Sequence, residues 1–188
     1  MITAEAPETG IARKLITLYG KKTSVEGHYH KNGGGFIANI AHADEAAFVG
    51  KDAMVLEDAQ VLGNAQILDK AAILGKAQVR DNAKVSGKVR VIENAQVYGN
   101  AKVYDMALVG GNAKIGGSVE AYGTVWLCGD VDVTSGKFFS YKISSNGNSA
   151  APGEYGARYY LNAEKELKKE MEKMCKKIMG LNEKDEKG

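Results

Sequence analysis

Three histidines are the side chains best suited to acid–base or metal chemistry, and all lie in the first quarter of the 188-residue chain. His28 and His30 are two residues apart, so on an extended strand they would share one face and could hold a metal ion together. No third ligand follows at a matching spacing, which favours ordinary structural roles for both and predicts no metal site. His42 lies between Ala41 and Ala43, and an exposed capping residue is its simplest interpretation.

The other reactive residues form no recognisable catalytic pattern. Cys128 and Cys175 are too few for a disulfide framework or a zinc cage, and Cys128 is predicted to be a surface or interface thiol. Asp130 and Asp132 could contribute to a calcium site, although a solvated turn is the simpler interpretation. The glycine-rich residues 32–35 lack the Lys-Ser/Thr pair of a P-loop. We therefore expect no cofactor.

A six-residue period organises about half of the chain. Stepping by six from residue 47 meets eleven alanines and four valines without a break, and the residue two places later is usually Val or Ile. Two places further on stands Gly, Asp or Glu, often followed by Asn. The small residues of the period are Ala47, Ala53, Ala59, Ala65, Ala71, Ala77, Ala83, Val89, Ala95, Ala101, Ala107, Ala113, Val119, Val125 and Val131.

Each repeat predicts one short strand followed by one corner. Side chains two residues apart on a strand point to the same face, so the small residue and the branched residue point inward together. Gly, Asp and Asn tolerate the left-handed backbone angles of tight corners. A strand this short cannot bury its face alone, whereas parallel coils stacked about 4.8 Å apart can. The sequence therefore predicts an all-β protein with a β-solenoid over residues 47–136.

Two windings fit the repeat, and electrostatics separates them. The Gly/acidic position alternates with a twelve-residue period, so a twelve-residue coil would stack the acidic residues Glu57, Asp69, Asp81, Glu93 and Asp105 in one column. Carboxylates about 5 Å apart would repel one another unless a cation lay between them. An eighteen-residue coil instead interleaves the acids with glycines. We therefore predict three strands per coil and about five coils.

The eighteen-residue winding also sorts the outward residues into an apolar face, a polar face and a mixed face. A contiguous apolar surface usually marks an interface. The apolar face collects Met54, Leu56, Ala72, Leu74, Ile92, Leu108, Trp126 and Cys128, with Arg90 as its exception. The polar face carries Gln60, Gln78, Arg80, Gln96, Lys114 and Asp132.

The repeat is flanked by segments of different composition. Residues 1–46 are predicted to cap the solenoid and lead into it, and the alternating apolar residues of 14–31 suggest a β-hairpin. Residues 137–158 are a predicted linker and residues 159–188 a predicted helix. The apolar stripe of this helix is Leu167, Met171, Met174, Ile178 and Leu181.

We predict that this stripe and the apolar face form an interface. Two arrangements satisfy the prediction: the helix docks on its own solenoid, or several chains meet with their helices swapped or bundled. The predicted interface residues are Met54, Leu56, Leu74, Ile92, Leu108, Trp126, Leu167, Met171, Met174 and Ile178.

The period resembles the hexapeptide repeat of the left-handed β-helix superfamily, which includes bacterial acyltransferases. The words NAKV and YGNA look closer to bacterial and phage proteins built from GNAxV repeats. The resemblance implies a single-stranded left-handed parallel β-helix and a homo-oligomer, with a trimer favoured. In the acyltransferases a histidine on or near a coil acts as general base, which makes His42 a weak catalytic candidate. The chain departs from the pattern because Leu, Ile or Tyr often follows the aliphatic residue directly.

Composition gives limits on function. The net charge is +2 with 26% charged residues, which predicts neither a nucleic-acid nor a membrane partner. The first residues lack the features of a secretory signal, so we expect a cytoplasmic protein. The leading hypothesis is a non-catalytic, self-associating β-solenoid that binds a protein or small molecule. The analogy with phage proteins built from GNAxV repeats implies an accessory role in a phage or mobile element. The alternatives are a divergent acyltransferase using His42, and a small-ligand or nucleotide binder in grooves between subunits.

Overall fold

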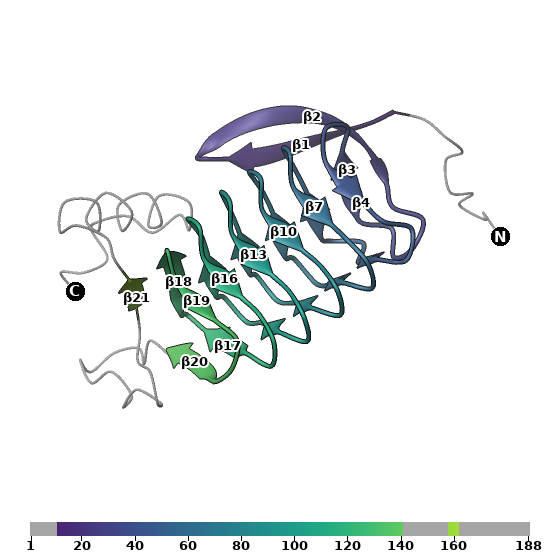
Figure 1. Cartoon of the computed structure of the whole chain (residues 1–188). Helices are drawn as coiled ribbons and strands as arrows, with labels where there is room; N and C mark the ends of the chain where they lie inside the picture. Colours follow the sequence, from purple (N-terminus) through teal and green to yellow (C-terminus); the bar gives the residue numbers. More distant parts are fainter. Residues whose placement is uncertain (1–10, 141–157, 162–188) are drawn as a thin grey trace.

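The computed structural model describes residues 11–140 and 158–161, and in them the chain winds into a left-handed parallel β-solenoid (Figure 1). Three sheets run along the solenoid, and we name them by their outward side chains. The apolar sheet contains β1 (Ala12–Leu18), β2 (Lys21–Tyr29), β3 (Phe36–Ala38), β6 (Met54–Val55), β9 (Ala72–Ile73), β12 (Arg90–Val91), β15 (Leu108–Val109), β18 (Trp126–Gly129) and β21 (Arg158–Leu161). The glutamine sheet contains β4 (His42–Ala43), β7 (Gln60–Val61), β10 (Gln78–Val79), β13 (Gln96–Val97), β16 (Lys114–Ile115) and β19 (Asp132–Val133). The lysine sheet contains β5 (Phe48–Val49), β8 (Gln66–Ile67), β11 (Lys84–Val85), β14 (Lys102–Val103), β17 (Glu120–Gly123) and β20 (Lys137–Ser140).

The strand register confirms the eighteen-residue winding. Gln78 pairs in parallel with Gln60 on one side and with Gln96 on the other, so each coil advances by eighteen residues and contributes one strand to each sheet. There are about six coils rather than the expected five. The additional coil begins at Phe36, which pairs with Met54 although the preceding residues lack the Ala-x-Val words. Pairing therefore extends one coil beyond the visible repeat.

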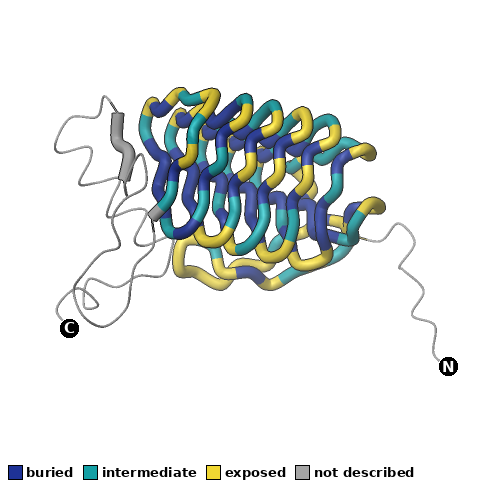
Figure 2. The backbone as a smooth tube through the Cα atoms, turned by 90° about the horizontal axis from the view of Figure 1, so that it is seen from below, coloured by how far each residue is buried: buried dark blue, intermediate teal, exposed yellow. Residues whose placement is uncertain are grey.

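The inward positions of the repeat form one continuous core. Every small residue of the period, from Ala47 to Val131, is at most 1% exposed. The branched residues two places later complete the same cluster, and Val133 at its end is only partly buried. Figure 2 shows these buried positions aligned from coil to coil. The expected inward face is therefore confirmed along the whole repeat.

The corners explain why acids and glycines alternate. Each acid of the twelve-residue period has a positive φ, from 55° at Asp69 to 65° at Asp105. Its carboxylate accepts a hydrogen bond from the amide of the glycine eighteen residues later; Asp69 Oδ2 lies 2.8 Å from the Gly87 nitrogen. The same contact recurs at Glu57–Gly75, Asp81–Gly99, Glu93–Gly111 and Asp105–Gly123. Acids and glycines alternate every six residues, and each coil is eighteen residues long. Each acid therefore lies beside a glycine of the next coil, whose amide donates to it.

The predicted hairpin is present and lies over the apolar sheet (Figure 1). Its strand β2 pairs antiparallel with β3, and Ile16 on its inner side belongs to the same buried cluster as Leu56 and Leu74. At its turn, the Tyr19 hydroxyl donates to the Glu57 carboxylate at 3.1 Å. Burial, followed by the negative charge of Glu57, raises the pKa of Tyr19 to about 12. The hairpin is therefore fixed to the corners as well as to the apolar face.

Strand pairing continues past the expected end of the solenoid at residue 136. Strand β20 joins the lysine sheet beside β17, and β21 joins the apolar sheet beside β18. Residues 159–161 of the segment predicted as a helix are part of strand β21, and the rest of that segment, with its stripe from Leu167 to Leu181, lies outside the described residues. Among the residues that are described, no helix is long and apolar enough to cross a membrane.

Candidate functional site

The histidines occupy three different environments at the N-terminal end of the solenoid. His28 is exposed on β2, whereas His30 follows that strand and is only 8% exposed. Nε2 of His30 donates to the main-chain oxygen of Asp44 at 3.0 Å, and its Nδ1 lies 3.0 Å from the main-chain oxygen and 3.3 Å from the main-chain nitrogen of Asn32. Both ring nitrogens of His30 are thus engaged by the backbone. Its role is to hold the loop before the first coil.

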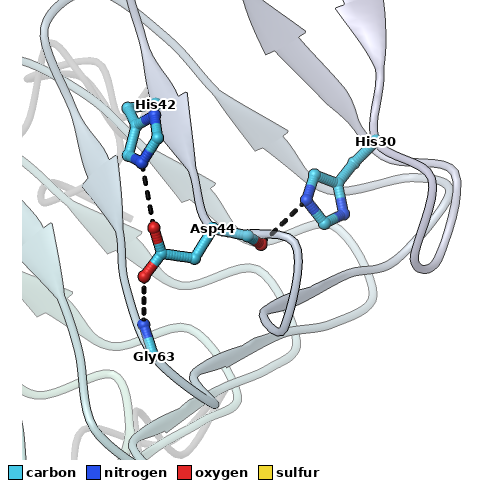
Figure 3. Close-up of polar contacts among 4 residues, drawn as sticks. All are labelled: His30, His42, Asp44 and Gly63. Carbon is cyan, nitrogen blue, oxygen red and sulfur yellow. Dashed lines mark hydrogen bonds and ion pairs between the residues drawn. The ribbon is translucent and has the colours of Figure 1, made fainter.

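His42 is the histidine whose ring faces solvent beside a carboxylate. It lies on β4, the edge strand of the glutamine sheet, directly beside Gln60. Nε2 of His42 is 3.0 Å from Oδ1 of Asp44, and the side chain of His42 is 60% exposed. The other carboxylate oxygen of Asp44 accepts from the Gly63 amide at 2.7 Å (Figure 3).

Asp44 is the centre of this arrangement because it contacts both histidines. Its main-chain oxygen accepts from His30, and its carboxylate holds His42 and the Gly63 amide (Figure 3). The Gly63 amide and then the His42 contact hold the pKa of Asp44 below its usual value. An ionised Asp44 orients the His42 ring and leaves Nδ1 as the nitrogen that could exchange a proton with a bound molecule. The sequence placed His42 at an outward position but did not single out Asp44.

The low pKa of Asp44 leads to a pH prediction. Because the pKa is lower in the folded state, the contribution of ionised Asp44 to stability is complete above about pH 4 and is lost as the pH falls through the lowered value. Asp44→Asn removes this titration. We therefore expect the free energy of unfolding, measured by urea titration, to fall less between about pH 5 and about pH 2 in this variant than in the parent. An equal fall in both proteins would contradict the assignment, and Asp58→Asn at an exposed corner is the control.

The predicted interface residues of the solenoid lie together on the apolar sheet. Leu56, Leu74, Ile92, Leu108 and Trp126 are each at most 6% exposed within one chain, and Met54 is half-buried. The hairpin contributes Ile16 to this cluster, so part of the covering comes from a segment that the sequence assigned only to the end of the solenoid. The remaining interface residues, Leu167, Met171, Met174 and Ile178, lie outside the described residues. Self-association through this face stays a prediction.

Cys128 and the paired aspartates have structural surroundings. Cys128 is 1% exposed in the apolar cluster rather than at the surface. Oδ1 of Asp130 accepts from the Asn112 side-chain amide at 3.0 Å, which continues a corner ladder that starts at Asn94. Asp132 is exposed on β19. Within residues 11–140 and 158–161, no three His, Cys, Asp or Glu side chains converge in a way that could hold a metal ion.

One aromatic column and one cation–π pair on the other sheets were not anticipated from the sequence. On the lysine sheet, Tyr104 stacks on Tyr122 and Tyr122 on Phe139, with ring centroids 5.0 Å apart in both pairs. On the glutamine sheet, the guanidinium of Arg80 lies 4.5 Å from the ring centre of Tyr98. The aromatic residues of this column are eighteen and then seventeen residues apart, about the length of one coil, and that spacing is the signal that could have revealed it.

No family model, curated protein or solved structure matches this chain. The similarity to hexapeptide-repeat proteins consequently rests on the repeat itself and on the eighteen-residue register of the coils.

Proposed function

We propose that the protein is a non-catalytic β-solenoid that acts by binding. The observation that carries this proposal is that acidic and histidine side chains, which could otherwise serve in catalysis, make hydrogen bonds that hold the fold together. The carboxylates of the acidic corners accept hydrogen bonds from glycine amides, and the ring of His30 is engaged on both nitrogens by the backbone. A site for catalysis needs such groups available to a substrate.

The two polar sheets are the surfaces on which a partner would bind. The glutamine sheet carries Gln60, Gln78 and Gln96 in one column, and the lysine sheet carries Lys84 and Lys102 in another. Paired parallel strands hold these side chains at a spacing of about 4.8 Å, so a ligand meets a preformed array. Self-association as a trimer and an accessory role in a phage or mobile element are parts of this proposal that rest on the resemblance of the repeat.

The proposal is tested by native purification followed by mass spectrometry of co-purified proteins and small molecules. We expect a partner to be recovered with the parent chain. One of the two single variants, Gln78→Lys on the glutamine sheet or Lys84→Glu on the lysine sheet, should lose this partner, and the other should keep it. His42→Ala should retain that partner. Recovery of the same partner with both surface variants would contradict binding through these sheets.

A divergent acyltransferase is the second candidate, and the His42–Asp44 contact favours it. In that reaction His42 Nδ1 would take a proton from the acceptor amine or hydroxyl as this group attacks the acyl carbonyl, and the thiol of the acyl donor would leave. Asp44 would orient the ring through Nε2. Thermal stabilisation by acetyl-CoA, together with loss of biological activity in a folded His42→Ala protein, would support this candidate over the first. Retained activity in that variant would exclude it.

A further inference from the structure

The longest strand at an open sheet edge in the described part of the chain is β1. Among the residues that the structure describes, it pairs with β2 alone and stands at the end of the strand order of the apolar sheet. All seven of its residues are in register with β2, so no bulge interrupts the strand. The other side of such a strand presents main-chain N–H and C=O groups that can pair with a further strand.

The short edge strands at the N-terminal end of the solenoid are covered by the chain itself. Residues 32–35 run along β5, where the Gly35 amide donates to the Val49 oxygen at 2.8 Å and the Val49 amide donates to the Asn32 oxygen at 3.0 Å. A Cβ at Gly35 would clash with Val49, so glycine is required for this close approach. Beside β4, the His30 ring caps the main-chain oxygen of Asp44. The fold protects these two-residue edges, whereas the longer edge of β1 has no such cover in residues 11–140 and 158–161.

The two charges of β1 are held by groups of the same chain. Nη2 of Arg13 lies 2.8 Å from Oε1 of Glu26, and Nζ of Lys14 lies 5.5 Å from the centre of the Phe36 ring. The strand contains no proline, and its outward residue Leu15 is 67% exposed. Edge strands that stay single commonly carry proline, a bulge or charges that repel a further strand. β1 instead presents a regular backbone with an exposed leucine at its centre.

We propose that β1 pairs antiparallel with β1 of a second copy of this chain, about a two-fold axis at Leu15. With the axis there, all seven residues pair, Leu15 meets Leu15 of the second copy, and Arg13 meets Thr17. Shifting the axis to Lys14 or to Arg13 would set two like charges directly opposite each other, which destabilises a strand pair. Shifting it the other way would leave the first residues of β1 unpaired. The centred register is therefore the one that the sequence of the strand favours.

The main chain of β1 can form its hydrogen bonds in this register. Leu18 and Lys21 flank the two-residue turn of the hairpin, so they form a hydrogen-bonded pair, and bonded positions alternate along an antiparallel pair. Arg13, Leu15 and Thr17 therefore direct their main-chain groups away from β2 and toward the open edge. Leu15 of the two copies can then exchange both N–H···O=C bonds, with Cα atoms about 5.5 Å apart. The dimer does not depend on the binding function proposed above, because it uses neither polar sheet.

The first test is sedimentation velocity of the full-length chain over a range of concentrations. We expect a monomer–dimer equilibrium, and we expect Leu15→Lys to raise its dissociation constant roughly tenfold, because two lysines would then meet at the axis. Ser24→Lys is the matched control. Ser24 pairs with Leu15 across the hairpin and is also exposed, but it lies on β2, whose edge β1 occupies, so this variant should leave the dissociation constant unchanged.

Cysteine cross-linking tests the register. Leu15→Cys places a thiol opposite the same thiol of the second copy, at a Cα separation within the range of a disulfide, so we expect a covalent dimer on non-reducing electrophoresis after oxidation. Thr17→Cys would lie opposite Arg13, and its two thiols would be about 14 Å apart along the strands, too far for a disulfide. Both variants are compared with the oxidised parent, which carries Cys128 and Cys175.

Three results would overturn the proposal. One is a parent chain that is monomeric at every concentration, even where Leu15→Lys loses a co-purified protein, because the edge would then bind another protein instead of a second copy. Another is an equal dissociation constant for Leu15→Lys and Ser24→Lys, as for a trimer that forms through a different surface. The third is cross-linking of Thr17→Cys as efficient as that of Leu15→Cys. A dimer lost in Leu15→Lys, with the partner of the polar sheets retained, supports pairing through β1.

Discussion

Gly87→Ala is expected to destabilise the solenoid by about 2–5 kcal/mol, which is large for the addition of one methyl group. Gly87 has a φ of +82°, where a residue with a Cβ costs about 1–2 kcal/mol. A Cβ at this position would lie 2.5 Å from the main-chain oxygen of Asp105 in the next coil. Backbone cannot move aside without disturbing the stacked coils, so the contact adds roughly 1–3 kcal/mol of strain.

Gly63→Ala is the matched control for this variant. Gly63 also has a positive φ, of 65°, and its amide also donates to an aspartate carboxylate. Its nearest neighbour is different, because a Cβ there would find Asp81 no closer than 3.4 Å. We expect a loss of only about 1–2 kcal/mol, measured with Gly87→Ala by chemical unfolding. Equal losses at both sites would show that the backbone angle, and not coil spacing, limits the corners.

The register of the fold was predictable because charge and hydrophobicity both depend on it. A twelve-residue coil would have placed Glu57 and Asp69 in one column, whereas the eighteen-residue coil separates them with glycines. Repulsion between acids was sufficient to select the winding. The favourable contact was not predictable from repulsion, because the bond from the Gly75 amide to Glu57 depends on the corner's backbone angles.

The covering of the apolar sheet shows where sequence patterns stop. The alternation in residues 14–31 predicted a hairpin, but alternation does not determine where the hairpin lies. Its position depends on long-range contacts such as that between Tyr19 and Glu57, which are 38 residues apart. The visible repeat likewise begins at residue 47, whereas the first coil begins at Phe36, because pairing with Met54 tolerates residues outside the pattern.

The candidate site was predictable only in part. Residues two apart on a strand share a face, and that rule applied to His42 and Asp44 would have paired them. The same rule would place His28 and His30 on one face, but the strand ends at Tyr29 and the His30 ring contacts the backbone of Asp44. The contact of Asp44 with the Gly63 amide depends on coil stacking and has no signal in local sequence.

The narrow core leads to the second large prediction, Ala83→Leu. Ala83 is 0% exposed, and its neighbours in the adjacent coils are the small residues Ala65 and Ala101. Stacked coils are held about 4.8 Å apart by their hydrogen bonds, so the interior cannot widen locally to admit three more carbon atoms. We expect a loss of roughly 1–3 kcal/mol in the free energy of unfolding, or failure to fold if the strain spreads along the coils.

Lys84→Leu separates this packing effect from a change in strand propensity. Lys84 directly follows Ala83, begins β11 and is exposed on the lysine sheet, so a leucine there meets solvent and should change stability by less than about 0.5 kcal/mol. Both variants are compared by urea unfolding followed by circular dichroism. A similar loss at both positions would mean that the inward and outward positions are equally constrained, which contradicts an inward-facing Ala83. A large loss at Ala83 alone assigns the constraint to the alanine column, whose small side chains let three strands close around so narrow an interior.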